Sequence, residues 1–169
     1  MLKLYAIYIG GKVPKAHIEL HDLVFAIGKN INDCIPSIKA QRFGSPKSLH
    51  IDAYVSLQYI DGYEIVLQKE PNNNEHKLFC INTWFYDPDV LWEGHELSFR
   101  VEKQAGFAKQ KALAKLSPEK QKKHKDDLLD VDDCLQITEV DWYHLHFIPT
   151  SKTQSLSPEE FGYMPITKQ

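Results

Sequence analysis

The chain carries one sequence pattern twice, and this constrains its fold more than any other feature. Residues 4–29 align without gaps with residues 78–103, and residues 49–67 align with residues 129–147. Two copies are fewer than a stacked repeat array needs. The pattern therefore predicts a tandem duplication of one small module. Aligned pairs include His21 with His95, Phe25 with Phe99, and Asp61 with Asp141.

Each module is expected to contain four strands and one helix. Apolar and polar residues alternate in the second copy, as in antiparallel sheets that pack on one face and meet solvent on the other. The apolar members of this alternation are Phe79, Ile81, Leu97, Phe99, Val101, Leu135, Ile137, Tyr143, Leu145 and Phe147. Between the second and third strands, the helical spacing of apolar residues after Asn30 predicts a helix over 31–38, and residues 104–116 predict its counterpart. Pro36 is expected to bend or shorten the first of these helices.

These elements define an α+β fold made by tandem duplication of a ββαββ module. We expect two four-stranded antiparallel sheets, or one continuous sheet, each with a helix on its apolar face. The first module spans residues 1–70, a polar linker spans 71–76, and the second module spans 77–149 with an extra short helix near 117–126. The tail, residues 150–169, is either loosely ordered or a strap that docks on the body.

The hairpin turns of the two modules differ in sequence. Asp61-Gly62 predicts a tight hairpin turn, because glycine adopts positive φ at little cost. The aligned pair is Asp141-Trp142. Tryptophan is strained at positive φ, so we expect a different turn type or a bulge there.

Composition limits the location of the protein more than its function. The net charge of -3 gives no overall attraction to nucleic acid or acidic membranes. Cys34, Cys80 and Cys134 form neither an even disulfide set nor a CxxC pair, which favours a reducing cytoplasm. No run of about eighteen apolar residues is present, so no membrane span is expected.

A Glu-x-His pair opens the second strand of each module: Glu19 and His21, then Glu93 and His95. Imidazole and carboxylate on one face of a strand could bind a divalent metal, or could act as a base and its orienting partner. The alternative is a structural role at the turn into the strand, which a duplicated fold needs twice. His50 and Asp52 begin the third strand, and their best functional use would be to join this pair at a common sheet end.

Other candidate groups have solvated surface positions as their simplest interpretation. His144 and His146 are two apart on one strand and could capture a metal. Polyanion binding is a possibility for a local lysine strip, but only Phe107 is aromatic there and no arginine is present, so nucleic acid is not favoured. The strip consists of Lys103, Lys109, Lys111, Lys115, Lys120, Lys122, Lys123 and Lys125.

The first module has apolar residues where the second is largely polar. These residues require a cover, which the other module, the tail, a ligand or a partner subunit could supply. We expect self-association or a protein partner on this face. The interface residues are Tyr8, Val24, Ala26, Tyr54 and Val66.

Several blocks of the first module resemble the bacterial family known as domain of unknown function 1543. The resemblance implies a bacterial cytoplasmic protein, and brings no activity, substrate or catalytic residue with it. The blocks are Tyr8-Ile9-Gly10-Gly11, His17-Ile18-Glu19-Leu20-His21-Asp22, Phe43-Gly44, Leu49-His50-Ile51-Asp52 and Asp61-Gly62-Tyr63.

The sequence contains no phosphate loop and no recognisable catalytic spacing. It therefore favours a non-catalytic binding or protein-interaction module without a cofactor. The alternative is a small metal-dependent enzyme that uses a divalent metal at the junction of the two modules.

Overall fold

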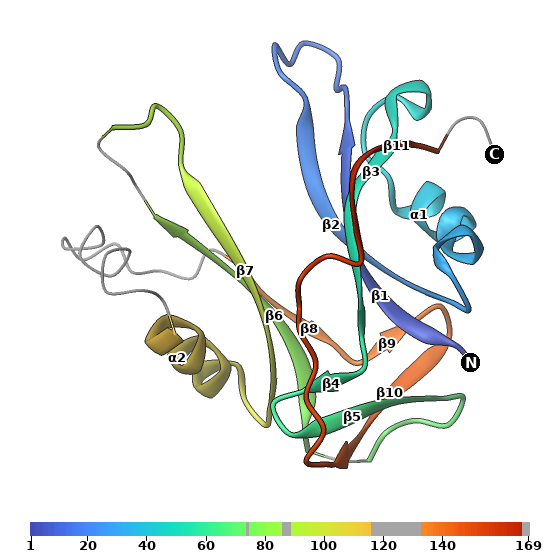
Figure 1. The fold of residues 1–169 in the computed structure, drawn as a ribbon, viewed down its shortest axis with the longest axis vertical. Helices are drawn as coiled ribbons and strands as arrows, with labels where there is room; N and C mark the ends of the chain where they lie inside the picture. Colours follow the sequence, from blue (N-terminus) through green and yellow to red (C-terminus); the bar gives the residue numbers. More distant parts are fainter. Residues whose placement is uncertain (74, 86–88, 116–132, 167–169) are drawn as a thin grey trace.

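The structure, a computed structural model, describes residues 1–73, 75–85, 89–115 and 133–166. In each half of the chain, two strands are followed by an α-helix and then by three further strands, among the described elements (Figure 1). The bounds are β1 (Lys3–Gly11), β2 (Leu20–Gly28), η1 (Ile31–Cys34), α1 (Ile35–Gln41), η2 (Pro46–Ser48), β3 (His50–Leu57), β4 (Tyr59–Ile60), β5 (Tyr63–Gln68), β6 (Lys77–Phe85), β7 (Gly94–Glu102), α2 (Ala105–Lys115), β8 (Asp133–Ile137), β9 (Glu139–Val140), β10 (Tyr143–Pro149) and β11 (Glu160–Pro165).

Both predicted helices are confirmed. The Asn30 side chain accepts hydrogen bonds from the backbone N–H groups of Asn32 and Asp33, at 3.0 and 3.3 Å, and so caps η1. Pro36 lies in the first turn of α1, where its missing N–H costs no helical hydrogen bond. The first helix is therefore a 3-10 turn followed by a short α-helix, as the proline predicts. The extra helix expected near 117–126 lies outside the described residues.

The α+β class with antiparallel sheets is confirmed, but the strands divide into three sheets. Their orders are β11-β3-β1-β2, β7-β6-β8 and β4-β5-β10-β9. The prediction of two four-stranded sheets, one for each module, is wrong. Strands β4 and β5 are not part of the β11-β3-β1-β2 sheet. Instead, β5 pairs with β10 of the second half. This pairing places Ile65 opposite Phe147, and both side chains are buried in a core that the two halves share.

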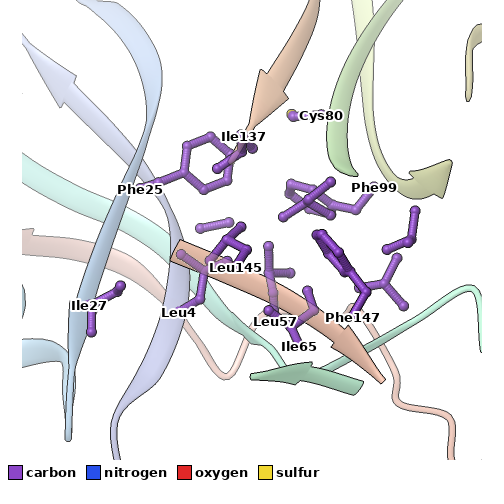
Figure 2. Packing of buried hydrophobic residues seen from close by; sticks show 14 residues of the cluster. Leu4, Phe25, Ile27, Leu57, Ile65, Cys80, Phe99, Ile137, Leu145 and Phe147 are labelled. Carbon is purple, nitrogen blue, oxygen red and sulfur yellow. The ribbon is translucent and has the colours of Figure 1, made fainter. Parts of the chain in front are cut away.

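The shared core lies where the three sheets meet (Figure 2). Phe25 and Phe99, which align in the sequence, make an edge-to-face contact with ring centroids 6.3 Å apart. In Figure 1 the β1–β2 and β6–β7 hairpins rise from the β4–β5–β10–β9 sheet and diverge. The other buried members are Leu4, Ala6, Ile27, Leu57, Ile60, Ile65, Leu78, Cys80, Val101, Ile137, Leu145 and Phe147.

In each hairpin, a helix covers the face that points away from the shared core. The expectation that one face of each sheet meets solvent is therefore wrong. In the first half, Ile7, Val24 and Ala26 are buried together with Ile38 of α1. In the second half, α2 covers Phe79 and Ile81 with its alanines. Odd-numbered residues of β1 pair with even-numbered residues of β2, so Tyr8 faces the side of the sheet opposite to Val24 and Ala26.

The chain itself therefore covers part of the predicted interface. Val24 and Ala26 are core residues of the single chain. Tyr8, Tyr54 and Val66 are partly exposed, but Tyr8 and Tyr54 project from opposite faces of their sheet and Val66 lies in the β4-β5-β10-β9 sheet, so they do not form the single predicted face. Self-association or a protein partner stays a prediction.

The tail is a strap, the second of its two expected forms. Strand β11 pairs with β3, and the backbone N–H of Ile166 donates to the Leu49 carbonyl at 3.2 Å. Nearer its start, Gln154 accepts hydrogen bonds from the backbone N–H groups of Gln58 and Tyr59, each at 2.6 Å. Among the described helices, none is both long and apolar enough to cross a membrane.

Each half caps an edge strand of the other half through an aspartate. Asp61 accepts from the backbone N–H of Val101 at 3.2 Å, and Asp141 accepts from that of Ile27 at 2.8 Å. Both aspartates have positive φ, 48° and 49°, and the next residues, Gly62 and Trp142, have φ of 82° and 66°. The two turns thus share one conformation, and the expected departure at Asp141-Trp142 is wrong.

Trp142 carries backbone strain that glycine would relieve. We expect Trp142→Gly to raise the free energy of unfolding by about 1 kcal/mol, because a left-handed φ penalises residues with a Cβ. The side chain is 81% exposed, so its loss removes little burial. Chemical denaturation measures the effect. Trp142→Ala is the matched control, because it removes the same ring and keeps the strain; equal stabilisation by both variants would contradict this explanation.

Candidate metal centre

Three neighbouring strands place a glycine between two histidines. Gly10 of β1 pairs with His21 of β2 on one side and with His50 of β3 on the other. Residues opposite each other in a sheet project to the same face. A Cβ at Gly10 would lie 2.8 Å from Asp52 Oδ2 and closer still to His50 Nε2, so a side chain there would fill the space between the histidines. This end of the sheet therefore needs glycine.

Two carboxylates complete the cluster around the histidines. Glu19 Oε1 lies 3.6 Å from His21 Nε2 and 3.3 Å from His50 Nε2. Asp52 lies close to the same two nitrogens: its Oδ2 is 3.4 Å from His21 Nε2, and its Oδ1 is 3.3 Å from His50 Nε2. These separations exceed the usual hydrogen-bond length of about 2.9 Å. They match the spacing of about 3.3–3.6 Å between ligand atoms that sit 2.0–2.2 Å from a tetrahedral metal ion.

The four residues are not equivalent. Glu19, His21 and His50 each offer one atom within 4.8 Å of the other two. Asp52 approaches the histidines with different oxygens, and so lies beside this group of three. Glu19, His21 and Asp52 are 27% to 36% exposed at the side chain, so solvent reaches the cluster. Two histidines and one carboxylate form a set that binds catalytic zinc and non-haem iron in other proteins.

His50 is the most constrained member, because its side chain is only 1% exposed. Its Nδ1 lies 2.8 Å from the Ser48 carbonyl oxygen, and a carbonyl only accepts, so Nδ1 carries the hydrogen. In the neutral ring the lone pair is then on Nε2, which has no hydrogen-bond partner among the described residues. Metal-binding histidines are commonly oriented in this way by a backbone carbonyl.

Two tyrosines pack on the histidine rings. The Tyr163 ring of β11 lies 4.3 Å from the His50 ring, centroid to centroid, and Tyr8 stacks on His21 at 5.3 Å. Burial raises the pKa of Tyr8, and the negative charges of Asp52 and Asp22 raise it further. The same negative charges favour a bound cation.

The second half has no equivalent cluster in its described part. Glu93 lies 3.8 Å from His95 Nε2, and His95 Nδ1 lies 3.3 Å from Asn82 Oδ1. His95 lies in β7 of the β7-β6-β8 sheet with Glu93 just before it, whereas His21 lies in β2 of the other half with Glu19 just before it. Trp84 occupies the position that aligns with Gly10, and it pairs with His95. Asp130 and Asp132, which align with His50 and Asp52, lie outside the described residues.

The remaining sequence-derived candidates lie elsewhere. His144 contacts Glu139 at 3.6 Å, and His146 Nε2 lies 2.9 Å from the Glu70 carbonyl. Within the described part of the lysine strip, Lys103 forms an ion pair with Glu75 and Lys111 forms one with Glu102. Lys120, Lys122, Lys123 and Lys125 fall outside it.

The suggestion that His50 and Asp52 join the Glu-x-His pair is confirmed, but the sequence analysis missed three contributors. These are the Gly10 space, the Ser48 carbonyl and the Tyr163 cover. Gly10 had a usable signal, because a glycine inside a strand often marks the close approach of another group. Ser48 and Tyr163 had no such signal, since one acts through its backbone and the other comes from the distant tail.

Comparisons with known proteins agree with this fold. The family described as Domain of Unknown Function (DUF1543) matches residues 16–67, a segment that contains all four clustered side chains. The crystal structure of a protein Il1583 from Idiomarina loihiensis superposes with a TM-score of 0.81 at 32% sequence identity, and the match covers 100% of both chains. A search of curated proteins finds no match.

Adjacent glycines allow a direct test of the space at the site. We expect Gly10→Ala to lower the free energy of unfolding by about 1–3 kcal/mol, because the new methyl group overlaps a histidine that is already pinned and buried. Gly11→Ala is the control, since its Cβ would meet nothing closer than Phe43 Cε2 at 3.7 Å. Urea denaturation compares the two, and equal stabilities would contradict the close packing at Gly10.

Proposed function

The chain belongs to the DUF1543 family, and we propose that it binds a divalent transition-metal ion through Glu19, His21 and His50. The observation that carries the proposal is the placement of buried His50, whose Nε2 makes no hydrogen bond among the described residues and lies 3.3 Å from both Glu19 Oε1 and Asp52 Oδ1. A buried polar nitrogen without a hydrogen bond is costly, and a metal ion held by the neighbouring carboxylates would satisfy it. A metal-free network of histidines and carboxylates is the competing explanation, but the four distances are longer than good hydrogen bonds.

The ligand types favour some metals over others. Imidazole nitrogen suits zinc, iron, nickel and copper, whereas magnesium and calcium prefer sites made of oxygen alone. A set with two imidazoles and one or two carboxylates therefore favours zinc, iron(II) or nickel.

The site is of the open type. Three protein ligands leave a coordination position for water or substrate, as in catalytic zinc sites, whereas structural sites are closed by four. Asp52 lies against both histidines and could accept a proton from a metal-bound water molecule. These features favour a small metal-dependent enzyme over the non-catalytic binding module.

We also propose that the two halves arose by tandem duplication and that only the first half keeps this site. Equivalent strands follow the same order, and equivalent residues such as Phe25 and Phe99 meet in the shared core. Trp84 takes the position of Gly10 in the second half, and it pairs with His95. Accordingly, the ligands come from one module and not from the module junction.

Metal titration with matched histidine variants tests this function. We expect protein stripped with a chelator to bind about one zinc ion by calorimetry, and to gain thermal stability from it. We expect His21→Ala to lose more than the 10–100-fold in affinity that removal of an outer-shell partner typically costs.

His95→Ala is the control, because it changes the aligned histidine of the second half. It is expected to bind zinc like the unchanged chain. Loss of binding in this variant would place the ligands at the junction, and the absence of binding by unchanged protein would exclude the proposed function.

A further inference from the structure

The geometry points to a second, separate site: a pocket around Arg100 that binds small organic anions. The pocket has a volume of about 240 Å³ and lies between the β4–β5 turn, the edge of β7 and the tail. Its basic lining residues are Arg100, Lys115 and Lys152. It shares no residue with the cluster at Gly10, so this inference is independent of metal binding.

Arg100 is a buried cation that is short of partners. Its residue is only 6% exposed, and its Nη1 donates to the carbonyl oxygen of Phe99, the preceding residue, at 2.7 Å. Its Nε has no hydrogen-bond partner, and no described carboxylate forms an ion pair with it. Arginine does not lose its charge in proteins, and a buried charge is stable only when paired. An anion in the pocket would supply that pair.

The first half has neutral residues at the positions equivalent to the cations of this pocket. Ala26 takes the position of Arg100, and Gln41 donates to the Phe25 carbonyl at 2.8 Å in place of the guanidinium. Lys115 is the last residue of α2, as Gln41 is of α1, and the 74-residue offset of residues 4–29 continued into the helices relates the two. The second half therefore carries two cations where the first half has neutral residues. In the first half, the neutral amide of Gln41 satisfies the equivalent backbone carbonyl, that of Phe25. A charged side chain is therefore not needed to satisfy this carbonyl in the second half.

The charges around the pocket leave an excess of cations. Asp61 is its acidic lining residue, and the carboxylate of Asp61 already accepts the backbone N–H of Val101. Lys152 Nζ donates to the Tyr59 hydroxyl at 3.4 Å, and among the described residues it has no carboxylate partner. Three cations line the pocket, and its one carboxylate already accepts a hydrogen bond, so the charges favour an anionic ligand.

The walls and the size restrict the ligand further. Tyr59, Phe99 and Leu156 supply apolar surface beside the cations. The volume is below the range of about 300–1,000 Å³ that is typical of sites for drug-sized molecules. A phosphate or carboxylate group on a short apolar body fits this combination, because the guanidinium fork pairs with either group.

Titration with two small anions tests the pocket and separates the two headgroups. Phenyl phosphate and benzoate are added to the full chain while the side-chain Nε–Hε signal of Arg100 is followed by NMR, with sodium chloride at matched ionic strength as the reference. We expect a saturable shift of this signal with at least one of the two anions. Absence of a saturable shift with both would overturn the inference.

Variants show whether binding depends on these cations. We expect Arg100→Gln to weaken binding, measured by calorimetry, at least about 10-fold, the range of charge-assisted hydrogen bonds. Lys29→Gln, at an exposed position outside the pocket, is the control and is expected to bind normally. Lys115→Gln combined with Lys152→Gln provides the same test if Arg100→Gln does not fold. Unchanged affinity in the variants of the pocket would overturn the inference.

Discussion

Burial of both faces of the β1–β2–β3 sheet is the constraint on which the rest of the structure depends. The second half and the β4–β5–β10–β9 sheet cover one face, while η1, α1 and Ile166 cover the other. Neither covered face can hold a charged group without a partner. Polar chemistry is therefore confined to the sheet end, where Gly10 lies between His21 and His50 and where the strap β11 crosses β3.

Two similar halves produce two different sites in this account. The first half has a glycine at the centre of its sheet end, and the histidines and carboxylates converge on the space that glycine leaves. The second half has Trp84 there, but carries Arg100 and Lys115 where the first half has Ala26 and Gln41. The shared core preserves the fold in both halves, so residues outside it can differ without loss of the architecture.

Local patterns in the sequence predicted local structure well. The Asn30 cap, the helix that contains Pro36 and the Asp61-Gly62 turn follow from propensities that act within a few residues. The partition into sheets did not follow, because β5 chooses between partners far apart in the chain, and alternation cannot identify the partner. Alternation also gave a wrong assignment of residues to the two faces. Odd-numbered residues of one hairpin strand lie opposite even-numbered residues of the other, so the apolar residues that share odd or even numbers point to different sides. The site was partly predictable: the sequence grouped Glu19 with His21, but only the strand register brought His50 to them.

The response of the His50 ring to zinc tests the central claim most directly. Long-range 1H–15N NMR of metal-free protein distinguishes a ring nitrogen that carries a hydrogen from one with a free lone pair. We predict that Nδ1 carries a hydrogen, because it lies 2.8 Å from the Ser48 carbonyl oxygen, and that the Nε2 resonance shifts when one equivalent of zinc is added. An Nε2 resonance that zinc leaves unchanged would contradict the account.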